Sequence, residues 1–385
     1  MLPVFTWAGI HTYADQSLLR EGNIVKVRVS ETGIHCIPYD TLKAWGLRPA
    51  DVRVLGYGGQ MLSENFTLSK WDDVPSVAFH MEKGMDGVFN SGDYILFYAQ
   101  GTTRWDMKNG RWHHTQNPYS NYGYYFLSDS AGEKRLIEDQ SPIDDTQIAI
   151  DVDWYTYYGV HELDQINLID ASAGVNGGGR EFYGERLNAN QSKQTISFPT
   201  ENVITHLPSY CEVDLAATSS TPSTIEVRMN GSTKIGMTAA ISISDNYTRA
   251  EPGTVKMESY ATTTGRQQVE IEFKNTSTGA IAYLNYVEVN IPCALKMRGK
   301  EMAICNASEV MHAPYIRFTM SNANANTEVW RVTDGVNIQR MTADRNGDKL
   351  IWKDDNTNAE KYVALNPQAT GWLQPAKVGR IKNQN

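Results

Sequence analysis

The chain has 385 residues, of which 41% are hydrophobic and 21% are charged, and its formal net charge at pH 7 is −9. This composition is typical of a globular protein, and the length favours two or three domains. The negative charge argues against nucleic acid as the main partner, because phosphate binding needs concentrated Lys and Arg, and no apolar stretch is long enough to predict a membrane-spanning helix.

Two strands and a short helix are predicted near the N-terminus. Residues 24–30 alternate between apolar and basic side chains, which predicts a half-buried strand. A second strand is predicted at residues 34–39. Asp40 is then placed as the N-cap of a short helix over residues 41–45, which Gly46 would end.

An unbroken apolar run, Tyr94–Ala99, follows a turn formed by residues 90–93. A short apolar run bounded by turn residues is typical of a strand that is buried on both faces. We therefore expect Tyr94–Ala99 to be the central strand of the N-terminal domain. The neighbouring strand candidates alternate apolar with polar residues and should bury one face only. Besides the two strands predicted above, these candidates are residues 52–55, 77–81 and 122–127.

Residues 1–150 are accordingly predicted to form a mainly β domain with one short helix. A Gly- and Asn-rich passage at 163–180 precedes evenly spaced short strands, one of which ends in Asn230-Gly231, a strong hairpin signal. Many short strands with almost no helical period are typical of a β-sandwich or jelly roll, which we predict for residues 151–297.

Residues 298–374 hold further strand candidates, which either form a small third unit or add to an earlier sheet. Residues 375–385 are polar and are predicted to be a linker. The expected fold class is all-β with a minor helix: an antiparallel β domain, then a β-sandwich or jelly-roll domain, then additional C-terminal strands.

No strong catalytic motif is present in the sequence. G-x-S-x-G, the P-loop and G-x-G-x-x-G are absent. His161 and Glu162 begin like a zinc-peptidase motif, but position 165 is Gln where the second His is required. We assign no catalytic and no cofactor-binding residue.

The four cysteines are widely spaced: Cys36, Cys211, Cys293 and Cys305. None belongs to a CxxC pair, so a structural zinc site is not expected. Cys36 and Cys211 lie in predicted strands and are expected to be buried thiols, whereas Cys293 and Cys305 could pair. Residues 1–9 lack the features of a signal peptide, so either the protein is cytoplasmic or the sequence begins after cleavage.

His113 and His114, beside Trp112, could bind a metal ion or a ligand. Adjacent residues on a strand point to opposite faces, so the two imidazoles would share one ion only on an irregular backbone. The favoured interpretation is an exposed loop between strands.

Residues 344–348 (DRNGD) resemble the start of a calcium loop, with Asp344, Asn346 and Asp348 as candidate ligands. Lys349, however, stands where such a loop needs Gly. A hairpin turn at the Asn-Gly pair is the favoured interpretation, and calcium is the weaker alternative.

Aromatic residues are dense in two segments and include Trp105, Trp112, Trp154, Tyr155 and Tyr157. Exposed rings on a β-sandwich can stack on sugars, but large rings also dominate the interfaces between domains. Because a domain boundary is predicted near residue 150, packing between domains is favoured over ligand binding.

Eight stretches carry a further signal: GIHCIPYDTLKAWGL (33–47), VLGYGGQML (54–62), DGVFNSGDYILFYAQG (86–101), HHTQNPYSNYGYYFL (113–127), GGREFYGERL (178–187), YLNYVEV (283–289), WRVTD (330–334) and GRIKNQN (379–385). In this order they resemble the region that precedes the protease domain in gingipain-like cysteine peptidases. The surface sortase of the type IX secretion system of Bacteroidetes is the most similar member.

The resemblance implies that the chain is the N-terminal, non-catalytic part of a longer secreted or surface peptidase. In that family a caspase-like domain with the catalytic His and Cys follows, so no catalytic residue is carried over. The chain would contact its own peptidase domain and position it, its substrates or secretion partners. Its expected location is extracellular, at the cell surface and associated with the outer membrane, with the signal peptide removed.

A carbohydrate-binding or adhesive β-sandwich module at the cell surface is the alternative. The jelly-roll pattern of residues 182–291 and the many aromatic residues favour it. A self-contained hydrolase is least supported, because it would need a cleft with convergent acids, bases or a nucleophile.

Overall fold

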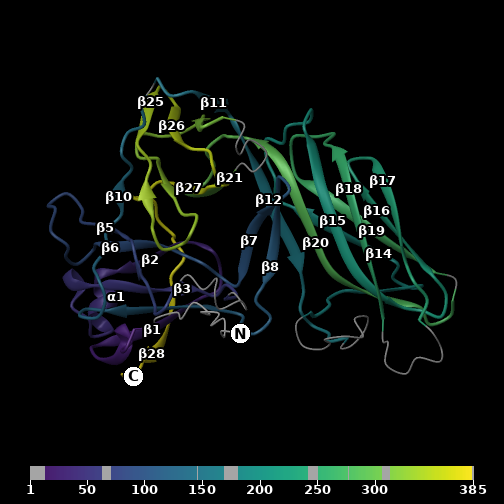
Figure 1. Ribbon diagram of the computed structural model, residues 1–385, viewed down its shortest axis with the longest axis horizontal. Helices are drawn as coiled ribbons and strands as arrows, with labels where there is room; N and C mark the ends of the chain where they lie inside the picture. The colour runs from purple at the N-terminus through teal and green to yellow at the C-terminus, as the bar shows by residue number, and fades with distance from the viewer. Residues whose placement is uncertain are drawn as a thin grey trace, which may run out of the picture.

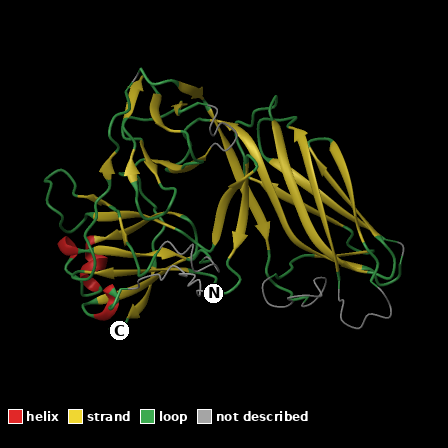
Figure 2. Ribbon diagram, in the orientation of Figure 1, coloured by secondary structure: helices red, strands yellow, loops and turns green. Residues whose placement is uncertain are grey.

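The computed structural model describes residues 14–62, 71–144, 146–168, 181–241, 250–275, 277–305 and 313–383. Over these residues the regular secondary structure is almost entirely β-strand (Figure 2), with one α-helix, α1 (Tyr39–Ala44), and two 3-10 helices, η1 (Leu18–Arg20) and η2 (Pro49–Asp51). The predicted all-β fold class with a minor helix is confirmed. Most of the Gly- and Asn-rich passage, from residue 169 to 180, lies outside the described residues.

Two sheets face each other in the N-terminal unit. One has the order β28-β1-β9-β3-β4 and consists of β28 (Ala376–Arg380), β1 (Ile24–Val29), β9 (Gly123–Ser128), β3 (Arg53–Gly58) and β4 (Ser76–Val77). The other has the order β2-β6-β5 and consists of β2 (Gly33–Pro38), β6 (Tyr94–Ala99) and β5 (His80–Glu82). Apolar side chains of both sheets and of α1 form one core between them.

β6 has the predicted bounds and lies in the middle of its sheet, buried on both faces. Its odd-numbered residues from Ile95 pack in the core between the two sheets, and Leu96 and Tyr98 pack in a second core with Trp330. The neighbouring strand β2 is also buried on both faces. The expectation of one buried face is wrong there, because strands from the C-terminal part of the chain cover the outer face of this sheet.

The helix starts earlier than predicted. Pro38 is the N-cap of α1, so Asp40 lies in the first turn instead of capping it. The Asp40 carboxylate accepts a 2.8 Å hydrogen bond from the hydroxyl of Ser91. Gly46 follows the helix with a φ of +79°, a left-handed conformation that suits glycine and ends the helix as predicted.

A β-sandwich occupies one side of the molecule (Figure 1). Its first sheet has the order β12-β20-β15-β18, with β13 also paired to β20; the strands are β12 (Trp154–Glu162), β20 (Ile281–Ala294), β15 (Pro208–Thr218), β18 (Glu251–Tyr260) and β13 (Arg186–Asn188). Its second sheet has the order β14-β19-β16-β17; the strands are β14 (Lys193–Phe198), β19 (Gln267–Lys274), β16 (Ser223–Met229) and β17 (Ser232–Thr238). The predicted Asn230-Gly231 hairpin joins β16 to β17.

The C-terminal unit consists of two further sheets. One has the order β10-β24-β23-β27-β21, with β10 (Glu138–Asp139), β24 (Gln339–Arg340), β23 (Glu328–Arg331), β27 (Lys361–Leu365) and β21 (Glu301–Cys305). The other has the order β11-β22-β26-β25, with β11 (Ala149–Val152), β22 (Tyr315–Met320), β26 (Lys349–Asp355) and β25 (Ala343–Asn346). β10 and β11 pair in parallel with strands far along the chain, so this unit is assembled from two separate chain segments.

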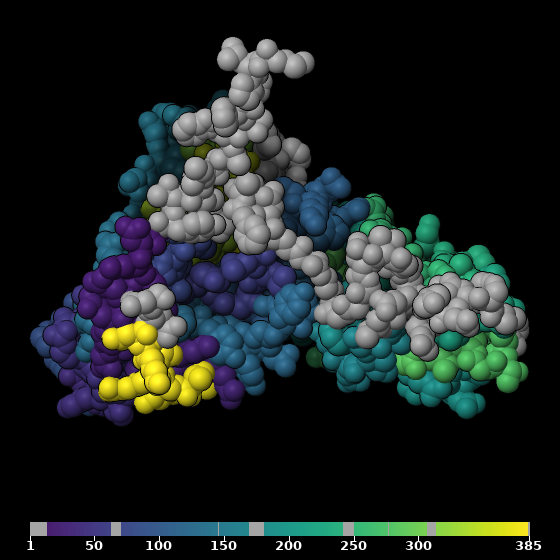
Figure 3. Space-filling view, turned by 60° about the horizontal axis from the view of Figure 1, so that its bottom comes forward, coloured from purple at the N-terminus to yellow at the C-terminus, as the bar shows by residue number. Residues whose placement is uncertain are grey.

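The predicted linker at residues 375–385 is wrong for its first half. Ala376–Arg380 forms β28, which pairs antiparallel with β1 and completes the N-terminal sheet. Figure 3 shows this C-terminal segment, in yellow, at the surface against the N-terminal residues in purple. The polar composition that suggested a linker fits an edge strand, which is exposed along one side.

A two-stranded hairpin, β7 (Thr103–Lys108) and β8 (Arg111–Gln116), extends from the N-terminal unit to the sandwich (Figure 1). No helix among the described residues is long and apolar enough to cross a membrane.

Replacing Gly58 with Ala should lower the free energy of unfolding by about 2–4 kcal/mol. Gly58 has a φ of +84°, and an added Cβ would lie 2.5 Å from the carbonyl oxygen of Gln100. Gly231 is the matched control, because it has a φ of +77° with nothing within 4 Å. Gly231→Ala should lower the free energy of unfolding by about 1 kcal/mol. Denaturant unfolding of both variants checks this, and equal losses would show that the contact with Gln100 is unimportant.

Candidate functional site

A cleft of about 890 Å³ lies between the β7–β8 hairpin and the first sheet of the sandwich. β8 contributes His113 and His114, β12 contributes Glu162, and β20 contributes Tyr286 and Glu288. The cleft thus brings β8 next to β20, which lies more than 150 residues later in the chain.

The alternation of side chains along the strands explains why this face of the sheet is polar. On β20, Val287 and Val289 face the core of the sandwich, so Glu288 between them must face the hairpin. On β15, Cys211 and Val213 belong to the same core, and Glu212 faces outward in the same way. The hairpin then covers this outer face, which leaves Glu288 only 1% exposed.

Glu212 and Glu288 are direct cross-strand partners in the pairing of β15 with β20. Like charges directly opposite each other destabilise a sheet unless cations or donors compensate them. The side chains around the two carboxylates supply that compensation and define the chemistry of the site.

His113 and His114 both contact the carboxylate of Glu288. Nδ1 of His113 lies 2.8 Å from Oε1, and Nδ1 of His114 lies 2.7 Å from Oε2. The backbone N–H of His114 also donates to Oε2, at 2.7 Å. The predicted exposed loop is therefore wrong: these residues lie in β8, and the hairpin holds them against the sandwich.

His114 is held between two carboxylates, since its Nε2 lies 3.2 Å from Oε2 of Glu162. Burial alone would lower the pKa of His114, but Glu162 and Glu288 outweigh it and raise the pKa to about 9. His114 is therefore a cation at neutral pH and forms a buried ion pair across the interface.

A different set of neighbours stabilises the ionised form of Glu212. Its Oε2 accepts hydrogen bonds from the hydroxyl of Tyr210 at 2.6 Å and pairs with Lys256 at 3.0 Å. Its Oε1 accepts a hydrogen bond from the hydroxyl of Tyr286 at 3.0 Å. Burial raises the pKa of Glu212, but these donors outweigh burial and hold the pKa below its ordinary value.

Asn290 fixes the hairpin against the sheet. Its side chain accepts from the backbone N–H of Trp112 at 2.7 Å and donates to the Trp112 carbonyl at 2.8 Å. The Asn290 side-chain amide thus bonds both the N–H and the C=O of Trp112, as the backbone of a neighbouring β-strand would. It sets the position of the two histidines that follow Trp112.

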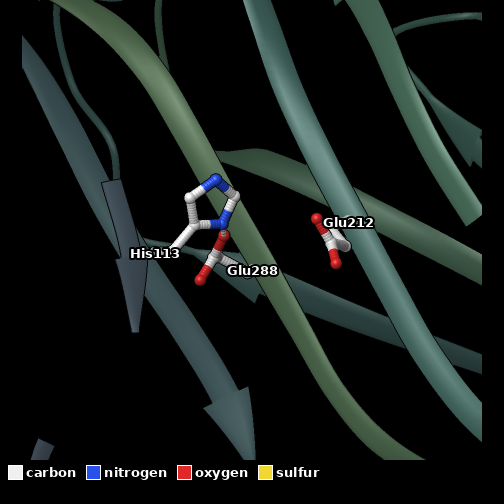
Figure 4. A group of neighbouring side chains, drawn as sticks. All are labelled: His113, Glu212 and Glu288. Carbon is white, nitrogen blue, oxygen red and sulfur yellow. Dashed lines mark ion pairs between the residues drawn. The ribbon is translucent and has the colours of Figure 1, made fainter. Parts of the chain in front are cut away.

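One group of three side chains in the cleft could hold a metal ion: His113, Glu212 and Glu288. Their ligand atoms all lie within 4.8 Å of one another. Figure 4 shows the three side chains converging from β8, β15 and β20. No other group of three such residues was found among the described residues.

The aromatic candidates lie mainly in packed surroundings. Trp112 is 1% exposed and forms a cluster with Trp105 around Tyr158, at centroid distances of 5.7 Å and 4.7 Å from that ring. Tyr155 is buried in the core shared by the sandwich and the C-terminal unit, and half-buried Trp154 and Tyr157 pack against it. Trp112 and Tyr155 are thus not accessible for stacking on a ligand.

The calcium candidates lie in a β-hairpin. Asp344 and Asn346 are in β25, which pairs with β26 through Asn346 and Lys349, and Gly347 has a φ of +62° at the turn. The carboxylate of Asp348 accepts a hydrogen bond from the backbone N–H of Asn322 at 3.1 Å. The predicted hairpin is confirmed.

Glu212 and Glu288 were not selected from the sequence. A Glu that alternates with apolar residues in a strand is the ordinary pattern of a solvent-exposed face. The only available signal was that Tyr and Asn occupy the adjacent outward positions, which is weak evidence of a covered face.

The sequence matches no protein-family model, and no curated protein matches it. Among solved structures, dimeric latent PorU from Porphyromonas gingivalis aligns with 97% of this chain, with a TM-score of 0.81 and 22% sequence identity. This chain spans 34% of the PorU chain. The two therefore share a fold over about a third of PorU.

Two carbohydrate-binding modules align with 34% of this chain, each with a TM-score of 0.23. One is CBM36 in complex with calcium and xylotriose, 17% identical and covered over 98% of its length. The other is the CBM36-1 domain of a multidomain xylanase from the hindgut metagenome of Trinervitermes trinervoides, 11% identical and covered over 96%. TM-scores this low do not indicate a shared fold.

Proposed function

We propose that this chain is the non-catalytic β-rich part of a gingipain-like peptidase related to the type IX sortase. It acts as a scaffold that positions a peptidase domain, and with it substrates or secretion partners, at the cell surface. The observation that carries this proposal is the PorU-like fold over 97% of the chain, together with the 34% of PorU that it spans. The eight sequence stretches that resemble this family support the same function.

The packing between the three units supports a rigid scaffold. One core contains residues of both the sandwich and the C-terminal unit, such as Val289 and Trp352. A second core joins the N-terminal sheet to the C-terminal unit, through residues such as Leu96 and Trp330. The β7–β8 hairpin makes the third connection. Each unit is therefore held by the other two.

The cysteines offer no activated nucleophile. All four are buried and free, which also leaves Cys293 and Cys305 unpaired. Burial raises the pKa of Cys36 to about 11 and that of Cys211 and Cys293 to about 12. A catalytic cysteine needs the opposite shift, because the thiolate is the nucleophile.

We expect all four cysteines to resist iodoacetamide at pH 8 in the native protein and to react after unfolding. With a pKa near 11, only about a thousandth of a thiol is ionised at pH 8, and burial blocks access to it. Intact-mass spectrometry before and after addition of guanidinium measures this. Rapid alkylation of one native cysteine would contradict the absence of a reactive thiol.

The gene sequence beyond the codon for Asn385 tests the proposed function. We expect a caspase-like segment with a His and a Cys, and a peptidase assay of this chain alone should show no thiol-dependent cleavage. An unrelated segment or a stop codon there would overturn the proposal, and so would cysteine-dependent cleavage by this chain.

A further inference from the structure

We propose that His113, Glu212 and Glu288 bind one divalent transition-metal ion, with Zn²⁺ as the representative species. The site lies at the contact between the β7–β8 hairpin and the sandwich, and it is independent of the scaffold function proposed above. Its ligands come from three strands, β8, β15 and β20 (Figure 4). A bound ion would therefore join the hairpin directly to the sheet.

An unsatisfied buried atom is the first argument. Glu288 is 1% exposed, and its Oε1 is buried without a hydrogen-bond donor among the described residues. Nδ1 of His113 lies 2.8 Å away, but no hydrogen bond joins the two atoms. A cation held between these two atoms would satisfy the carboxylate oxygen and take the imidazole nitrogen as a second ligand.

The second argument is the position of Glu212. It lies directly opposite Glu288 in the sheet, and both carboxylates face the same side. Among the described residues, Oε1 of Glu212 accepts a hydrogen bond from Tyr286 alone, so it retains a lone pair for a metal. The donors on Glu212 would orient this ligand, as outer-sphere hydrogen bonds do in protein metal sites.

The remaining carboxylate oxygen of Glu288 is also oriented. Its Oε2 accepts from the backbone N–H and lies next to Nδ1 of His114. The carboxylate thus cannot rotate away from His113 without losing those contacts. This leaves Oε1 as the atom that points to the proposed ion.

The ligand set selects the class of metal. One imidazole and two carboxylates suit Zn²⁺ and its first-row neighbours, whereas Ca²⁺ and Mg²⁺ prefer all-oxygen sites with more ligands. Ligand atoms around tetrahedral Zn²⁺ stand about 3.3–3.5 Å apart. A separation of 4.8 Å, the upper limit within this group, must contract by about 1.3–1.5 Å, while the 2.8 Å between Nδ1 of His113 and Oε1 of Glu288 must open by about 0.5–0.7 Å. His113, with 25% of its side chain exposed, provides both the mobility and the entry path.

The full chain is first treated with a chelator to strip bound metal. Calorimetric titration of this chain with ZnCl2 then tests the proposal. We expect saturable binding of one ion, and Co²⁺ should give the visible absorption of a low-symmetry, protein-bound ion. His113→Asn and Glu212→Gln should each weaken binding by about tenfold or more. The partly exposed position of His113 lets the Asn variant keep its fold, which its circular dichroism and unfolding transition verify.

His80→Asn is the matched control, because His80 also pairs with a carboxylate, 3.2 Å from Glu82, but outside any three-ligand group among the described residues. It should bind Zn²⁺ as the unmodified chain does. A large excess of Ca²⁺ should not displace the metal. Absence of saturable binding, equal affinity in the His113→Asn variant, or displacement by Ca²⁺ would each overturn the proposal.

Discussion

Replacing Glu288 with Ala is expected to lower the free energy of unfolding by about 3–5 kcal/mol, in metal-free buffer that contains a chelator. The Glu288 carboxylate is the partner of His114 at 2.7 Å and accepts from its backbone N–H at the same distance. Without it, a buried imidazolium loses one of its two carboxylates, and a buried N–H loses its acceptor. Removing one member of a buried pair costs more than the pair contributes, because the remaining group stays desolvated.

Glu258→Ala is the matched control for this variant. Glu258 lies on β18 of the same sheet and pairs with Arg111 of the same hairpin, but 55% of its side chain is exposed. Exposed pairs contribute about 0–1 kcal/mol, so this substitution should have a small effect. Guanidinium unfolding curves of the two variants provide the comparison. Similar losses at both positions would mean that the Glu288 ion pair does not stabilise the interface.

The second large effect is expected for Trp112→Ala, which should lower the free energy of unfolding by about 3–5 kcal/mol. The ring is 1% exposed and packs with Cys305 and Tyr158, while the Lys361 ammonium lies 5.0 Å from its centroid. Truncation leaves a cavity at the junction of the hairpin, the sandwich and the C-terminal unit. The hairpin thereby loses packing against both Tyr158 of the sandwich and Cys305 of the C-terminal unit.

Limited proteolysis gives this variant a second measurement. If Trp112 anchors the hairpin, its tip at residues 109–110 should become a cleavage site in Trp112→Ala, while Tyr260→Ala, with a ring that is 60% exposed, should change neither stability nor cleavage. A Trp112→Ala chain as stable and as resistant as the unmodified one would refute the anchoring role.

The candidate site was the part of the molecule that the sequence predicted least well. The contact between His114 and Glu288 joins residues 174 positions apart. Each residue has an ordinary local explanation: an exposed His in a loop, and an outward Glu in a strand. Only the docking of the hairpin buries Glu288, and a pattern of alternation does not show what covers the outer face.

β28 illustrates the same limit. Its five residues carry no apolar run that would separate a strand from a linker. They become a strand because β1 offers an unpaired edge, more than 340 residues earlier in the chain. Backbone hydrogen bonds of this kind depend on the partner and are not encoded in the side chains of the strand itself.

The sequence by itself determined the all-β class, the doubly buried strand Tyr94–Ala99 and the hairpins at Asn230-Gly231 and Asn346-Gly347. These features depend on side chains within a few residues of one another, and apolar runs and left-handed turn residues act at that range. The tertiary structure alone decided which polar faces are buried and which residues meet at the cleft, because desolvation and ion pairing arise only when distant strands come together.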